Sequence, residues 1–82
     1  EYWNTLFNLL VDANKEWANK AAVLIVVVSA NNFAYNNKPS RTHSFDTGAA
    51  WENLALQGYA QGLVIHGLEG FDYDRAKKEL NI

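Results

Sequence analysis

An uninterrupted apolar run, Ala22–Val28, constrains this chain more than any other feature of its sequence. β-Branched residues dominate it and no polar residue alternates with them, which is typical of a strand buried on both faces. Such a strand needs neighbours on both edges and layers above and below it. The run is too short to span a bilayer and lacks the position of a signal peptide, so we expect a soluble protein.

Composition limits the number of domains and the kinds of partner that the chain can have. The chain of 82 residues suffices for one small domain only. Seven Lys and Arg residues against nine Asp and Glu residues give a formal net charge of -2, so no basic field favours nucleic acid or an anionic membrane as a partner. The absence of Cys excludes disulfides and thiolate chemistry and fits an intracellular, cytoplasmic location.

Helical periodicity lies on both sides of the apolar run. Apolar residues recur three and four apart from Trp3 to Trp17, which predicts one amphipathic helix that begins at or before the first residue. A second helix is predicted over residues 46–61, with Ser44 or Asp46 as its cap. Its apolar residues nearly encircle it, so we expect burial on most of its faces.

Turn signals define the remaining elements. Gly62 can end the second helix in the left-handed conformation, and a second strand, Leu63–His66, follows. The turn Gly67–Gly70 then leads to Asp72, which can cap a last helix. Residues 30–43 form a polar loop, for which a lid or binding loop and plain disorder are equally good interpretations. The order helix, strand, helix, strand, helix predicts a layered α/β or α+β fold.

Two histidines raise catalytic and metal-binding hypotheses. His43, Ser44 and Asp46 are the residue types of a hydrolase triad, but they lie too close in the chain to converge as base, nucleophile and orienting carboxylate. A helix entry is the simpler interpretation. His43 and His66, with Asp46 or Glu69, lack metal-site spacing, so we expect no metal. The dinucleotide and phosphate-loop fingerprints are also absent from the sequence.

The turn Gly67–Gly70 is the remaining candidate site. It lies between a strand end and a helix start, where glycine lets the backbone approach a flat ligand and present N–H groups. A plain strand-to-helix turn explains the same residues, and the residue pattern alone favours that interpretation.

Three stretches occur together in a characteristic order and spacing: the run Ala22–Val28, the D-x-G-A-A-x-x-N-L pattern of Phe45–Leu56, and Gly62–Asp72 with its E-G-F-D turn. Together they resemble the flavin-dependent nitroreductase family, and the resemblance covers nearly the whole chain. It implies an α+β, three-layer α/β/α fold, of which residues 1–82 are the central part of a single domain. The absence of a cap ahead of Glu1, and of any Met, fits a piece truncated at both ends.

The resemblance also implies an activity. FMN would bind at a homodimer interface, with NAD(P)H as hydride donor and a nitroaromatic, quinone or related small molecule as electron acceptor. Gly67 and Leu68 would lie against the flavin ring, and the N–H groups of Glu69 and Gly70 would face its N5 and O4 edge. Fixed donors there stabilise charge gained on reduction, so no side chain need act as acid or base. We expect Gly70→Val to weaken flavin retention and leave folding nearly intact.

The chain also departs from the family pattern. The family's N-terminal segment with Arg and Ser for the FMN phosphate, and its basic C-terminal segment, have no counterpart here. Because a phosphate needs charge-assisted partners, we expect activity in a full-length parent and none in the isolated chain. The competing hypothesis is a non-enzymatic interaction module, in which the helix over residues 46–61 pairs with a partner and Gly67–Gly70 is only a turn.

Overall fold

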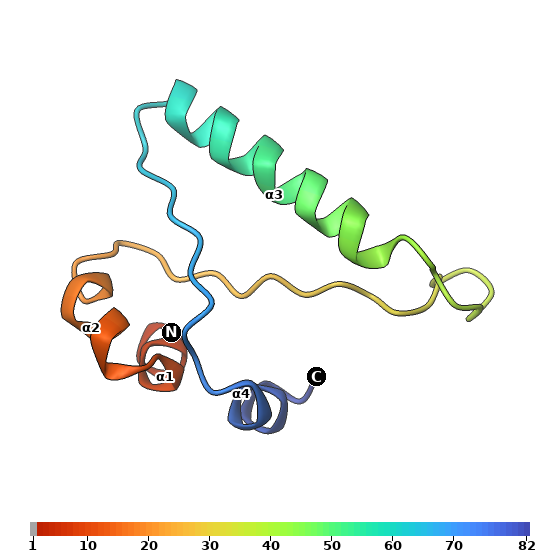
Figure 1. Ribbon diagram of the computed structural model, residues 1–82, viewed down its shortest axis with the longest axis horizontal. Helices are drawn as coiled ribbons and strands as arrows, with labels where there is room; N and C mark the ends of the chain where they lie inside the picture. The colour runs from red at the N-terminus through yellow and green to blue at the C-terminus, as the bar shows by residue number, and fades with distance from the viewer. Residues whose placement is uncertain (1) are drawn as a thin grey trace. The chain divides into compact units, whose positions relative to one another are not determined.

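The computed structural model describes residues 2–82 and shows four helices in that range (Figure 1). The described residues divide into two compact units, one formed by residues 2–26 and 67–82 and the other by residues 27–66. None of these helices combines the length and the apolar character that crossing a bilayer requires. The helices are α1 (Trp3–Leu9), α2 (Asp12–Ala18), α3 (His43–Ala60) and α4 (Tyr73–Leu80).

The predicted sheet does not form, so the assignment to an α+β, three-layer nitroreductase-like fold is wrong. Residues 2–82 contain two isolated antiparallel bridges and no strand. Residues 22–28 and 63–66 have irregular backbone, and no backbone hydrogen bond is present along residues 22–28. The physical reason is that β-branched residues favour extended backbone, whereas a strand also needs an edge with which to pair. The described chain supplies no such edge to either segment.

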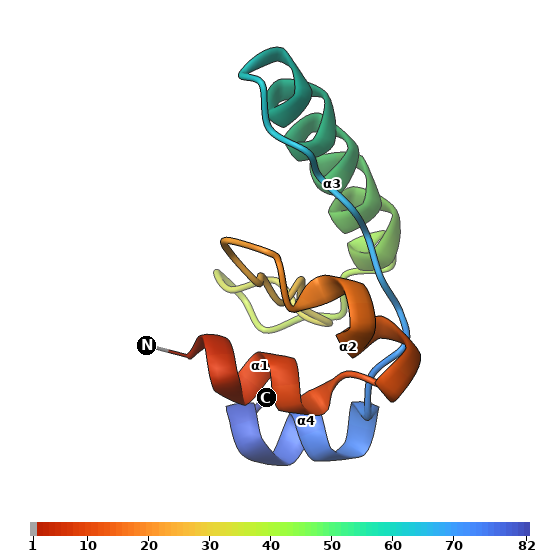
Figure 2. The same cartoon turned by 90° about the vertical axis from the view of Figure 1, so that its left-hand side faces the viewer.

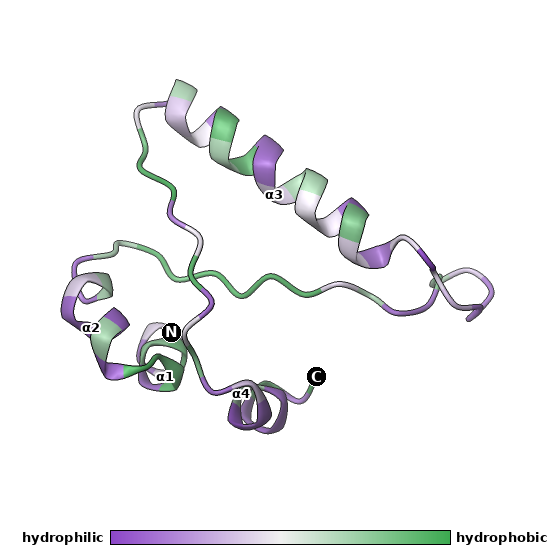
Figure 3. Cartoon of the chain, viewed as in Figure 1, coloured by the Kyte–Doolittle hydropathy of each residue, from purple (hydrophilic) through white to green (hydrophobic). Residues whose placement is uncertain are grey.

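Apolar side chains of the would-be strand remain exposed as a result. Val23 and Ile25 are each 67% exposed, and Val64 is 95% exposed. Figure 3 shows the segment that follows α2 as a continuous apolar stretch. The buried apolar residues of the described chain are Leu9, Ala18 and Ala76.

The helix predicted to reach Trp17 without interruption is divided in two. α1 ends at Leu9 and α2 begins at Asp12, while Leu10 and Val11 between them are extended, with ψ angles of 149° and 154°. The Val11 N–H donates to the carbonyl of Gly70 at 2.9 Å. A contact with a distant part of the chain therefore overrides the local helical pattern.

In the first unit, α1 and α4 lie side by side (Figure 2). Leu9 of α1 and Ala76 of α4 are 4% and 5% exposed. The Arg75 guanidinium donates to the Asn8 carbonyl at 3.0 Å and so ties α4 to α1. The predicted cap is confirmed, because the Asp72 carboxylate accepts a hydrogen bond from the Arg75 N–H at 2.9 Å.

In the second unit, α3 confirms the predicted long helix but differs at its start. It begins at His43, and its N-cap residue is Thr42, which makes no side-chain capping bond. Ser44 and Asp46 lie inside the helix, so neither is the cap. The predicted termination is confirmed, because Gly62 follows the helix with a φ of 80°.

The described residues do not supply the burial expected of α3. Phe45, Leu56 and Tyr59 are 79%, 61% and 82% exposed. Gly58 is the buried residue of the helix, because the Ile65 side chain packs on it.

The loop predicted over residues 30–43 is present up to residue 42, because His43 begins α3, and residues 31–40 form an ordered turn within it. The Phe33 N–H donates to the Lys38 carbonyl at 2.9 Å, and the Ser40 N–H donates to the Asn31 carbonyl at 2.8 Å. Asn37 adopts a left-handed φ of 55° between them.

Two glycines of α3 provide a test of this packing. A Cβ at Gly48 has nothing within 4 Å, whereas a Cβ at Gly58 would lie 2.6 Å from Cγ1 of Ile65. We expect Gly48→Ala to raise the free energy of unfolding by up to about 1 kcal/mol, because alanine favours a helix interior over glycine. Gly58→Ala should gain less or lose stability, because Ile65 must move. Denaturant unfolding followed by circular dichroism measures both, and equal gains would contradict the packing of Ile65 on Gly58.

Candidate functional site

The predicted cofactor-binding turn, Gly67–Gly70, lies in the first unit just before α4. Its last carbonyl is held by two donors from the start of α2. The Gly70 oxygen accepts from the Val11 N–H at 2.9 Å and from the Asn14 side-chain amide at 3.1 Å. The Asn14 bond is partly buried. Sequence analysis did not single out Asn14, because a polar residue at this point of a helical pattern carries no sign of a distant partner.

A second backbone bond anchors the chain immediately after the turn. The Asp72 N–H donates to the Leu9 carbonyl at 2.9 Å, and Leu10 forms an isolated antiparallel bridge with Phe71. The junction between α1 and α2 therefore fixes the backbone that follows the turn.

The N–H groups of the turn itself are unpaired. Among residues 2–82, no hydrogen bond has the backbone N–H of Gly67, Leu68, Glu69 or Gly70 as its donor. Gly67 and Glu69 are exposed, and Leu68 and Gly70 are partly exposed. Residues 2–82 thus provide no backbone acceptor for these four N–H groups.

The neighbours of Gly70 leave no room for a side chain at this position. A Cβ at this position would overlap the side-chain amide of Asn14 and would lie 2.9 Å from Cγ2 of Val11. This packing corrects the expectation that Gly70→Val leaves folding nearly intact, because a larger residue displaces the groups that hold the turn.

Glu69 reaches from the turn to the first residue of α4. The Tyr73 hydroxyl donates to the Glu69 carboxylate at 3.3 Å. Desolvation of the Tyr73 hydroxyl, then the negative charge of Glu69 and this hydrogen bond, raise the Tyr73 pKa above its ordinary value of 10.0. The Tyr73 ring, which is 50% exposed, also packs at 4.3 Å between centroids on Phe71.

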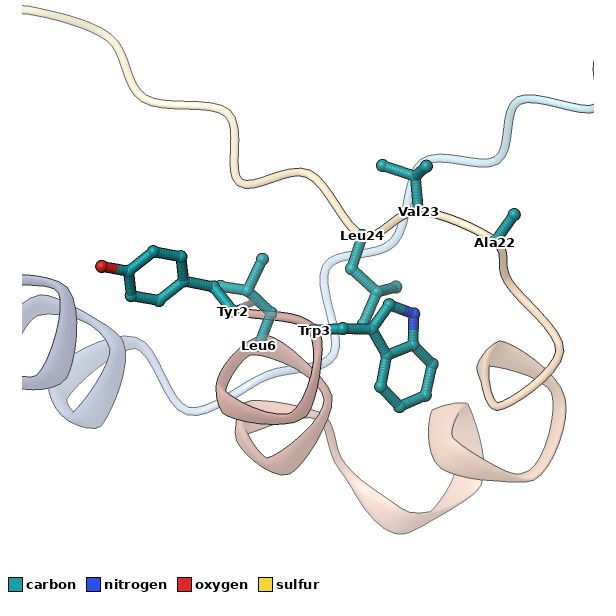
Figure 4. A pocket seen from close by; sticks show the side chains of 6 residues that line it. All are labelled: Tyr2, Trp3, Leu6, Ala22, Val23 and Leu24. Carbon is teal, nitrogen blue, oxygen red and sulfur yellow. The ribbon is translucent and has the colours of Figure 1, made fainter.

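An open cleft lies elsewhere in the first unit (Figure 4). Trp3 lines this cleft and donates its indole N–H to the Ala21 carbonyl at 3.1 Å. Gly67–Gly70 do not line this cleft, so the structure does not join the predicted cofactor residues to it. The cleft has a volume of about 270 Å³ and is lined by Tyr2, Trp3, Leu6, Ala22, Val23 and Leu24.

The histidine cluster at the start of α3 does not form the triad considered from the sequence. The Nδ1 atom of His43 lies 2.8 Å from the Ser29 hydroxyl and 3.3 Å from the Ser44 hydroxyl. The Asp46 carboxylate accepts from the Thr42 hydroxyl at 2.9 Å, so its hydrogen bond is not to His43. Within the described range, no group of three His, Asp or Glu side chains is placed to hold a metal ion.

The chain is 32% identical over 75 residues to a protein of Mycolicibacterium smegmatis named "Uncharacterized 15.4 kDa protein in ask 5'region". The alignment covers 92% of this chain and 49% of the relative, so the chain spans about half the length of the curated relative it matches. No family model matches the chain, and no solved structure matches it. The nitroreductase resemblance therefore stays a prediction.

The packing at Gly70 predicts a loss of stability. We expect Gly70→Val to lower the free energy of unfolding of the flavin-free protein by about 1–3 kcal/mol, because the new side chain displaces Asn14 and Val11. Denaturant unfolding measures this change, with Gly48→Ala as the control for a position without close neighbours. An unchanged stability of Gly70→Val would show that Gly70 does not pack against α2.

The contact between Glu69 and Tyr73 predicts a pH effect. Because the folded-state pKa of Tyr73 is raised, its contribution to stability is complete below the unfolded pKa and is lost as the pH rises through the folded pKa. Glu69→Gln should move the Tyr73 pKa down toward 10.0. Ultraviolet titration of tyrosinate, with Tyr73→Phe subtracted to isolate this group, measures the shift. A pKa unaffected by Glu69→Gln would contradict the contact.

Proposed function

We propose that the chain is part of an FMN-dependent oxidoreductase that uses NAD(P)H to reduce nitroaromatic, quinone or related small-molecule acceptors. The observation that supports this best is the row of four N–H groups in Gly67–Gly70 that have no backbone acceptor among residues 2–82, next to a Gly70 carbonyl that accepts two hydrogen bonds from the start of α2. The sequence resemblance independently assigns these same residues to the flavin. Unpaired backbone donors beside a fixed carbonyl suit a flat ligand with acceptor atoms along one edge.

The residues of the turn would act through their backbone. Gly67 and Leu68 would lie against the ring, and the N–H groups of Glu69 and Gly70 would point at its N5 and O4 edge. When bound, FMN supplies hydride and electron transfer between the nicotinamide and the acceptor. The turn is anchored before any ligand binds, so its dipoles need little reorganisation as negative charge develops. This proposal assigns no proton transfer to a side chain of the turn.

The proposal includes a homodimer in the cytoplasm. The exposed apolar residues of α3, among them Phe45, Leu56 and Tyr59, support a second copy as the partner, because association would remove several large apolar side chains of one helix from water. The absence of Cys fits the reducing compartment.

The same exposed helix favours a second candidate function, a non-enzymatic interaction module. In that case α3 pairs with a partner and the unpaired N–H groups of Gly67–Gly70 bond only to water. The two candidates differ in whether the protein binds flavin, and dimerisation through α3 is compatible with both.

Flavin binding therefore tests the proposal. We expect the full-length protein to be purified yellow or to take up FMN on incubation, with flavin fluorescence reporting the dissociation constant. Under anaerobic conditions NAD(P)H should bleach the bound flavin, and a quinone should restore its colour. Free FMN with NAD(P)H and no protein is the control for uncatalysed reduction. A colourless protein that gains no flavin would contradict the oxidoreductase and favour the interaction module.

A further inference from the structure

We propose that residues 22–28 are a self-association surface, on which a second copy of this chain pairs through antiparallel backbone hydrogen bonds. The proposal goes beyond the proposed function, because it needs no flavin and uses a surface other than α3. Among residues 2–82, no backbone hydrogen bond has its donor or its acceptor in residues 22–28. Figure 1 shows this run as an extended trace without a helix. A row of N–H and C=O groups without backbone partners is a template for pairing with another chain.

The side chains of the run favour association as well. Val23, Ile25 and Val27 are all exposed, and in an extended segment such alternate residues lie on one face. Val26 and Val28, which alternate with them, are also exposed. Both faces of the run therefore present apolar surface, and pairing with another chain would remove part of it from water.

The charge pattern favours a second copy as the partner. No charged residue lies between Lys20 and Lys38, so two copies can meet along this run without placing like charges opposite each other. Proteins commonly block such pairing with charged side chains or Pro, and residues 22–28 contain neither. The run also lacks Gly, which weakens a strand.

The run is self-complementary in the antiparallel direction. A two-fold axis at its middle residue places Ile25 opposite Ile25 of the second copy. Val23 then lies opposite Val27, and Leu24 lies opposite Val26. Every pair is aliphatic, and cross-strand pairs of apolar side chains stabilise an antiparallel pair of strands. Because both copies use the same surface in this contact, the expected product is a dimer.

Single cysteines test this register, because the chain has no Cys of its own. We expect Ile25→Cys to form an intermolecular disulfide when the full chain is oxidised with diamide, since directly opposed Cα atoms lie about 4.5–5.5 Å apart. The matched control is Val23→Cys, because Val23 and Ile25 are each 67% exposed. The two copies of residue 23 would be separated by four residues along the strands, about 14 Å, which is beyond the reach of a disulfide. Non-reducing gel electrophoresis measures the crosslinked dimer.

A second pair of variants tells this surface from α3. We expect Ile25→Lys to lose the dimer in sedimentation experiments, because pairing would place two like charges opposite each other. Circular dichroism shows whether the variant keeps its helices. Phe45→Lys changes an exposed residue of α3 and should leave a dimer that forms through residues 22–28 in place.

Each outcome decides the proposal. A disulfide in Ile25→Cys but not in Val23→Cys, with loss of the dimer in Ile25→Lys, supports it. Equal crosslinking of both cysteines indicates parallel or non-specific association and overturns it, as does a dimer lost only in Phe45→Lys. A monomer whose amides in residues 22–28 are protected from hydrogen exchange also overturns it, because another segment of the same polypeptide then covers the run. The proposed function is tested separately by flavin binding, so it can fail or stand independently.

Discussion

The first unit depends on backbone pairing between the α1–α2 junction and residues 70–72. The helical pattern of the N-terminal segment is interrupted at Leu10 and Val11, which places the Leu9 carbonyl and the Val11 N–H opposite the backbone of residues 70–72. A continuous helix would have used both groups internally. The interruption loses local hydrogen bonds and gains bonds between distant segments, and the two small buried residues Ala18 and Ala76 lie in the same unit. The candidate site depends on this interruption, because the Val11 N–H that it frees donates to the Gly70 carbonyl of the turn.

The sequence predicted the elements whose causes are local. The Asp72 cap, the left-handed Gly62 and most of the loop predicted over residues 30–43 follow from short-range backbone chemistry, and they are present. α3 was also predicted, although its first residue was not. Where the outcome depends on a distant partner, prediction failed. The run Ala22–Val28 has the composition of a strand but no edge with which to pair, and the helix predicted through Leu10 is broken by a contact with the turn before α4.

In the candidate site too, the features with local causes were predicted and those that depend on distant contacts were not. Sequence pattern selected Gly67–Gly70, and none of the four N–H groups donates a backbone hydrogen bond within residues 2–82. The residues that hold the turn, Val11 and Asn14, could not be found from the sequence. Their role depends on a side-chain amide meeting a carbonyl far along the chain, and no spacing rule encodes that meeting. The sequence pattern selected Gly70 because glycine lets a backbone approach a flat ligand. In the structure, glycine is required because Asn14 and Val11 occupy the space of a side chain there.

The chain leaves the first unit after residue 26 and returns to it at residue 67. The second unit is therefore an insertion between the two segments of the first unit. The hydrogen bonds of Leu9, Val11 and Asn14 join those two segments directly. The entropic cost of closing a loop grows only slowly with its length. Lengthening or shortening the inserted segment should therefore change the stability of the anchored turn little. Insertions and deletions should therefore be tolerated best in the polar loop of residues 31–40, where residues 31–39 are exposed.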